Sequence, residues 1–148
     1  MTIGEIIGPD CVVVGLRVAN KTQLLQDLAG RAATALGLDR RVIFDALQAR
    51  ENLGSTGLGK GFALPHARLE ALSDTFALFV RLARPIDFEA IDERPVDLVT
   101  LLLSPANGGN HHLATLAALS RPLREPEFVQ RLRQAKDAAT VYGVLAGA

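Results

Sequence analysis

Apolar positions in the first third of the chain recur at helical spacing. Leu24, Leu28 and Ala32 lie on one face of a helix that should begin after Asn20, a favourable N-cap residue. Gly37 follows the last periodic positions and predicts the end of this helix. The same spacing predicts further helices over about residues 39–50, from residue 111, around residues 128–132 and around residues 138–145.

Short apolar stretches between these segments predict β-strands over residues 62–64, 75–82 and 96–103. The third stretch is apolar at most positions, which is typical of a strand covered on both faces. Pro122 and Pro126 interrupt the helical pattern that starts at residue 111 and predict a break or kink near residues 121–126. Strands interleaved with helices favour an α/β fold in which helices sandwich a single β-sheet on both faces.

Composition and charge narrow the class of protein. The chain has 148 residues, 49% of them hydrophobic, so we expect one sizeable core and a single domain over residues 1–148. Sixteen Lys and Arg balance sixteen Asp and Glu, which argues against a nucleic-acid-binding protein. No apolar run is long enough to span a bilayer and no signal-peptide pattern is visible. We therefore expect no membrane insertion and a cytoplasmic location.

The segment from residue 50 to residue 66 holds the most chemical information. Its closely spaced glycines forbid a regular helix and let backbone N–H groups approach an anion. Pro65 restricts the backbone before His66, so the imidazole is held on a stiff support. Arg50 offers a planar fork of donors for phosphate oxygens, and the hydroxyls of Ser55 and Thr56 add donors. This set suits histidine phosphorylation, although a plain turn with a structural histidine is the simpler interpretation.

A second pair of candidates, His111 and His112, follows Asn110, a good N-cap residue. Both would lie in the first turn of a helix, where the helix dipole favours a bound anion and disfavours a protonated imidazole. One of them could face His66, but spacing alone selects neither, and two exposed histidines are the alternative. A metal hydrolase built on the three histidines would lack the HExxH or paired-cysteine spacing of familiar metal sites.

Three stretches of the glycine-rich segment form a recognisable set: Arg50-Glu51, residues 55–59 (STGLG) and residues 61–66 (GFALPH). Together they resemble the signature of the enzyme IIA family of the bacterial phosphotransferase system, in its fructose/mannitol and nitrogen-regulatory branch. The resemblance continues in one register through residues 85–98 to His112, and so covers nearly the whole chain. Residues 3–9 (IGEIIGP) resemble the start of nitrogen-type members.

The resemblance implies a mixed β-sheet, a phosphorylated His66, and a second histidine beside it, for which register selects His112 rather than His111. Arg50 matches the family arginine near the phosphoryl group, and Thr56 matches a hydroxyl position in the same loop. The implied donor is a small histidine-phosphocarrier protein that is itself charged by an enzyme I. The resemblance implies no cofactor and no metal ion.

Two functions remain open within this family: a IIA component that feeds a fructose/mannitol-type sugar permease, and a nitrogen-type regulator. The nitrogen-type opening, and the lack of an attached permease sequence, favour the regulator. Its output would be binding to proteins such as sensor kinases or ion transporters according to its phosphorylation state. The alternative to a phosphoryl carrier is a non-catalytic binding module, in which His66 has no chemical role.

Partner docking over His66 calls for an apolar rim, for which Leu58, Phe62 and Leu64 are candidates. Lys60 and Ala67 depart from residues common in the family and lie beside the proposed site, where we expect them to affect partner contacts. Pro122 is a third departure, and it affects the geometry expected for the helix that follows His112.

Overall fold

The computed structural model describes residues 1–148, the whole chain. Its elements, in chain order, are α1 (Ile3–Ile6), the 3-10 helix η1 (Pro9–Cys11), β1 (Val12–Leu16), α2 (Lys21–Leu36), α3 (Arg40–Asn52), β2 (Gly57–Gly59), β3 (Phe62–Ala63), β4 (His66–Leu69), β5 (Phe76–Ile86), β6 (Val96–Pro105), α4 (His111–Ser120), the 3-10 helix η2 (Arg121–Arg124), α5 (Pro126–Gln134) and α6 (Ala138–Ala146). No helix is both long and apolar enough to cross a lipid bilayer.

The six strands form one mixed sheet, which confirms the predicted fold class. The order is β1-β5-β6-β3-β2, and β4 also pairs with β6. β1 runs parallel to β5, and both β3 and β4 run parallel to β6, while β5–β6 and β2–β3 are antiparallel. The pairs Phe62↔Leu98 and His66↔Leu102 place β3 and β4 one after the other along the same side of β6.

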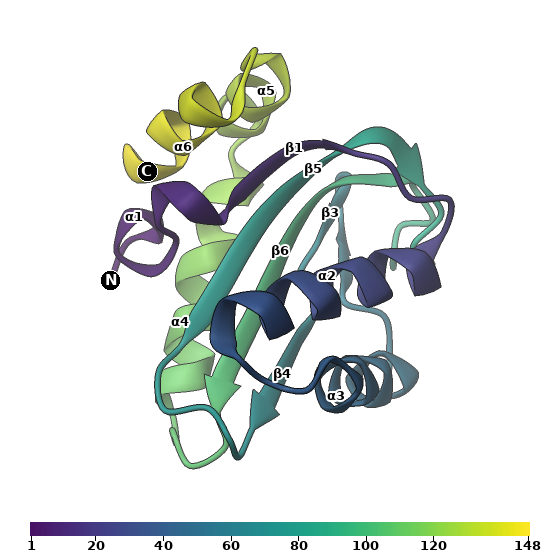
Figure 1. The fold of residues 1–148 in the computed structure, drawn as a ribbon. Helices are drawn as coiled ribbons and strands as arrows, with labels where there is room; N and C mark the ends of the chain where they lie inside the picture. The colour runs from purple at the N-terminus through teal and green to yellow at the C-terminus, as the bar shows by residue number, and fades with distance from the viewer.

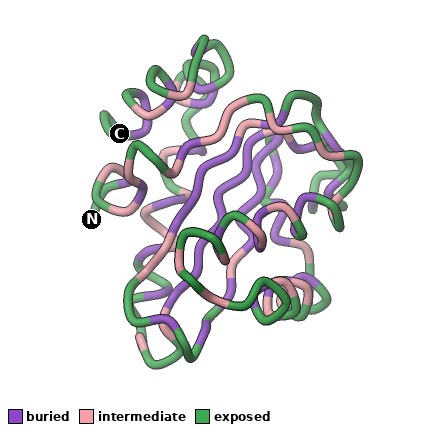
Figure 2. Tube along the Cα trace, in the orientation of Figure 1, coloured by how far each residue is buried: buried purple, intermediate pink, exposed green.

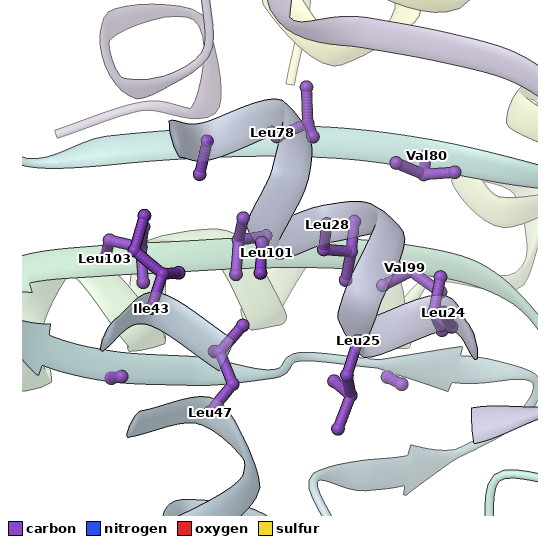
Figure 3. Packing of buried hydrophobic residues seen from close by; sticks show 14 of the residues in the cluster. Leu24, Leu25, Leu28, Ile43, Leu47, Leu78, Val80, Val99, Leu101 and Leu103 are labelled. Carbon is purple, nitrogen blue, oxygen red and sulfur yellow. The ribbon is translucent and has the colours of Figure 1, made fainter. Parts of the chain in front are cut away.

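Helices cover both faces of the sheet (Figure 1). On one face α2 and α3 contribute Leu24, Leu28 and Leu47, which pack with Val99 and Leu101 of the central strand β6 (Figure 3). On the other face a second core cluster joins sheet residues to α1, α4, α5 and α6. Strand β6 is buried along nearly all of its length and the outer sides of the helices are exposed (Figure 2). Burial on both faces explains why β6 is almost continuously apolar.

The caps predicted for the first long helix are present in α2. The Asn20 side-chain oxygen accepts the Gln23 N–H at 2.9 Å, and the Gln23 side chain in turn accepts the Ala19 N–H at 2.9 Å. Gly37 ends the helix in the left-handed region at φ 67°, and its N–H donates to the Ala33 carbonyl. These local bonds define which residues begin and end α2, and therefore which leucines face the sheet.

Several local predictions differ from the structure. The strand expected over residues 62–64 stops at Ala63, and the chain re-enters the sheet as β4, which was not predicted. Pro65 has no N–H to donate and interrupts the pairing between these segments. β1 was not predicted either; Gly15, at φ 82°, interrupts its short apolar run, and the register against β5 shifts there.

The helix expected from residue 111 begins there, but Asn110 does not cap it. Its backbone is already helical, at φ −74° and ψ −9°, and its side chain makes no capping hydrogen bond. An N-cap residue normally has an extended backbone, so this prediction was wrong in its detail. The break expected from Pro122 and Pro126 is confirmed: η2 separates α4 from α5, and Pro126 is the first residue of α5.

Candidate functional site

His66 is the first residue of β4, where the chain resumes pairing with β6 after Pro65. Its Nδ1 lies 2.8 Å from the Leu64 carbonyl oxygen. A carbonyl can only accept, so Nδ1 carries the proton. The other ring nitrogen, Nε2, then holds the lone pair. A backbone contact two residues away thus determines which nitrogen is nucleophilic.

Arg50 approaches this lone pair from the last turn of α3, a helix that packs beside β4 (Figure 1). Its Nε donates to Nε2 of His66 at 3.2 Å, and its Nη1 donates to the Gly54 carbonyl at 2.9 Å. Partial burial lowers the pKa of His66, and the Arg50 charge lowers it further, against opposing effects of the Leu64 carbonyl and Glu51. The imidazole is therefore neutral near pH 7, with Nε2 available for reaction.

His112 lies in the first turn of α4 and is 6% exposed. The centroid of its ring is 5.5 Å from that of His66. Burial, together with smaller effects of nearby His66 and Arg68, lowers the pKa of His112 to about 4. His111 is exposed and lines a different surface pocket beside Met1. The structure thus brings His112, and not His111, to His66.

Ser104 of β6 holds the His112 ring, with its Oγ 2.6 Å from Nδ1. Both residues are buried, and His112 is the only hydrogen-bond partner of the Ser104 hydroxyl. If Nδ1 carried the proton, the hydroxyl hydrogen would be buried without an acceptor, at a cost of about 1–3 kcal/mol. The hydroxyl therefore donates to Nδ1, and Nε2 of His112 carries the proton. No sequence signal pointed to Ser104, because its role comes only from its place on β6, where it faces His112 of α4.

Thr56 lies in the same loop as expected, but its hydroxyl is already used. It donates to Oε2 of Glu51 at 2.5 Å, and the Thr56 N–H donates to Oε1 at 2.8 Å. The Ser55 hydroxyl donates to the Phe88 carbonyl. Glu51 is itself buried and pairs with Lys21 Nζ at 2.8 Å. Both hydroxyls are donors, but in this structure they donate to acceptors within the protein, and Glu51 organises this loop.

The expected cradle of free backbone N–H groups is also largely absent. The N–H groups of Gly54, Gly57 and Lys60 donate respectively to the Glu51 carbonyl, the Ser55 hydroxyl and Asp92 Oδ2. These N–H groups already have acceptors within the protein, so they do not form an anion site in this structure. No group of three histidine, cysteine or acidic side chains has the geometry of a metal site, so the residue set of the metal-hydrolase alternative is missing.

The family model for the phosphoenolpyruvate-dependent sugar phosphotransferase system, EIIA 2, matches residues 5–147. The chain belongs to this family. A nitrogen regulatory protein of Bradyrhizobium diazoefficiens is 45% identical over 146 residues, covering 99% of this chain and 95% of the relative. A fructose-specific EIIA component of Haloferax volcanii is 43% identical, over 73% of this chain and 70% of its own. The crystal structure of the nitrogen regulatory protein IIA-Ntr of Neisseria meningitidis superposes with a TM-score of 0.91 at 33% identity, covering 97% of this chain and 98% of that one.

A cavity of about 440 Å³ opens beside His66 in this IIA fold. The three residues expected to form an apolar rim, Leu58, Phe62 and Leu64, all line it. Leu58 is 45% exposed, whereas the other two are buried and form its floor. Arg50 also lines the cavity, so the space next to the His66 ring offers a guanidinium and an apolar surface together.

Proposed function

We propose that the chain is a phosphoryl carrier of a nitrogen-type phosphotransferase system, acting as one IIA domain over residues 1–148. In this proposal Nε2 of His66 accepts the phosphoryl group from a histidine-phosphocarrier protein that an enzyme I has charged. The observation that carries the proposal is the contact of Arg50 Nε with Nε2 of His66, while Nδ1 is held by Leu64. A lone pair next to a guanidinium, at the wall of an open cavity, is suited to receive a phosphoryl group.

The transfer follows directly from these contacts. The Nε2 lone pair of His66 forms the new N–P bond as the donor's N–P bond breaks, and the donor ring, protonated on its other nitrogen, keeps the electron pair and leaves as a neutral imidazole. Nδ1 of His66 keeps its proton and goes on donating it to the Leu64 carbonyl, so no base is needed to prepare the nucleophile. The Arg50 guanidinium turns its donors from the ring nitrogen to the transferring oxygens.

His112 supplies the second stabilising group in this proposal. Its Nε2–H, set by the Ser104 hydroxyl, is a donor on a neutral ring 5.5 Å from His66 between centroids. A neutral N–H donor in this position would stabilise the negative charge on the phosphoryl oxygens beside the charged donors of Arg50. Thr56 acts on the site through Glu51, by holding the loop that Arg50 contacts at Gly54. The proposal requires no cofactor and no metal ion.

Regulation is the proposed output. Similarity at 45% identity over 99% of the chain to a nitrogen regulatory protein supports this choice over a sugar-permease role. Phosphorylation adds about −1.5 to −2 charge units at His66, next to exposed Leu58. Partners such as sensor kinases or ion transporters would distinguish the two forms by this charge. Because the proposed donor works in the cytoplasm, we propose the same location for this chain.

The test is phosphorylation of the purified protein with enzyme I, the phosphocarrier protein and phosphoenolpyruvate, followed by intact mass. We expect a gain of one phosphoryl group that is labile in acid, absent in His66→Ala and retained in the matched variant His111→Ala. A protein that stays unmodified while still binding its partners would instead be the binding module in which His66 is idle.

A further inference from the structure

A second depression of about 670 Å³ lies next to the His66 cavity, between the β2–β3 turn and the segment formed by η2 and α5. Four cationic side chains line it: Lys60, Arg94, Arg124 and Arg133. We call these four residues the cationic groove. No aspartate or glutamate is among the residues that line the groove or the His66 cavity. The chain as a whole has no net formal charge, so this positive charge is a local concentration.

Three of the four cationic side chains have no ion-pair partner within the protein. Arg133 is paired with Asp97, at 2.8 Å between Nη2 and Oδ1, and also donates to the Lys60 carbonyl at 3.1 Å. The side chains of Lys60, Arg94 and Arg124 are exposed and make no hydrogen bond or ion pair. Unpaired guanidinium and ammonium groups on one surface repel each other, which an acidic partner would relieve.

Contacts on both sides of the turn fix the backbone of Lys60. It lies in the left-handed region at φ 58°, which is unfavourable for a residue with a side chain, and two contacts hold it there. Its N–H donates to Asp92 and its carbonyl accepts from Arg133. The same Arg133 nitrogen leaves no room for a β-carbon at Gly61. The turn is therefore clamped from both sides, and the ammonium group of Lys60 projects from a fixed base.

The cationic groove is continuous with the His66 cavity, because Lys60, Leu123 and Arg124 line both. A protein that brings its own histidine to Nε2 of His66 must cover the cavity. A specific interface typically covers about 800 Å² on each partner, so its footprint would extend over the adjacent groove. Whatever protein exchanges a phosphoryl group with His66 therefore faces these cations.

We propose that the cationic groove is a docking surface for the phosphoryl donor, whose contact face carries Asp or Glu side chains beside its reactive histidine. The inference rests on the function proposed above and names the chemistry of the partner surface. Charges at the rim of an interface act mainly on the rate of association, and salt screens them over about 10 Å at 0.1 M ionic strength. Phosphorylation of His66 would then neutralise part of the positive charge and favour release of the donor.

The test compares two double variants that remove the same charge. Lys60→Asn/Arg124→Gln neutralises the groove, and asparagine tolerates the left-handed backbone at position 60. Arg40→Gln/Arg41→Gln neutralises two exposed residues at the start of α3, where cations oppose the helix dipole and where neither side chain lines the His66 cavity or the cationic groove. Initial rates of transfer from the phosphorylated phosphocarrier protein are measured between about 20 and about 300 mM salt, and the affinity for the unphosphorylated carrier is measured in the same buffers.

We expect transfer to the unchanged protein and to the α3 variant to slow by about tenfold over this salt range, and the groove variant to be about tenfold slower at low salt and insensitive to salt. Equal rates for both variants, or rates that rise with salt, would overturn the docking surface while phosphorylation of His66 leaves the proposed function intact. If the unchanged protein is not phosphorylated at any salt concentration, both proposals are wrong.

Discussion

Glu51 offers the sharpest test of how the site is held together. Its side chain is 2% exposed, and its carboxylate accepts two hydrogen bonds from Thr56 and pairs with Lys21, whose side chain is 16% exposed. Replacing Glu51 with Gln keeps the shape and one acceptor for the Thr56 N–H. It removes the charge opposite Lys21, and a buried ion pair that loses one partner costs about 3–5 kcal/mol. Because one acceptor remains, we expect a loss of about 3 kcal/mol in the free energy of unfolding.

The same lysine provides a matched control. Glu89 also lies near Lys21 Nζ, at 4.0 Å, but its side chain is 77% exposed. Glu89→Gln should therefore change the free energy of unfolding by less than about 0.5 kcal/mol. Urea unfolding measures both variants, and thermal unfolding should show a lower Tm for Glu51→Gln by about 6–12 °C. Adding Lys21→Met to Glu51→Gln should recover part of the loss, since the uncompensated ammonium group is then gone.

Glu51→Gln should also slow phosphorylation. Glu51 holds the loop at Thr56, and Arg50 contacts the same loop at the Gly54 carbonyl, so a displaced loop moves the guanidinium away from His66. We expect a decrease of about tenfold or more in the rate of phosphoryl acceptance, measured on folded protein well below its Tm. The reasoning is refuted if Glu51→Gln and Glu89→Gln lose the same stability, or if Glu51→Gln loses less than about 1 kcal/mol.

Three further predictions follow from the site. Arg50→Lys keeps the charge but loses the planar fork, so phosphoryl acceptance should slow by about 10–100-fold in time courses of intact mass, and an unchanged rate would contradict the role given to the guanidinium. Ser104→Ala removes the hydroxyl that sets the His112 tautomer, so nitrogen NMR should show the Nδ1–H form appearing and acceptance should slow several-fold; Ser104→Thr should retain the wild-type spectrum. The pKa of His112 is about 4 in the folded protein against an ordinary 6.5, so the unfolded chain binds more protons between these values and stability falls as the pH drops from 6.5 to 4. The loss should approach about 3 kcal/mol at pH 4 in urea unfolding, and the corresponding part should vanish in His112→Asn.

Local signals were enough for most of the helices. Asn20 and Gly37 mark the ends of α2 because a cap depends on hydrogen bonds within four residues of itself. Pro126 likewise marks the start of α5. The strands were harder, since β4 has only four residues and its identity as a strand depends on pairing with β6, more than thirty positions away. A four-residue segment with one exposed arginine has no periodicity that distinguishes it from a loop.

The sequence by itself determined the family, the position of His66 after a stiff proline, and the presence of Arg50 in the same motif, because these are properties of short stretches of chain. Register with the family selected His112, but only the tertiary structure decided which nitrogen of each ring carries the proton and that the Thr56 hydroxyl donates to Glu51. Those outcomes depend on which groups meet when β4 pairs with β6 and α4 packs over Ser104. A hydrogen atom in a buried site goes to whichever acceptor the fold brings within reach, and one-dimensional spacing does not contain that information.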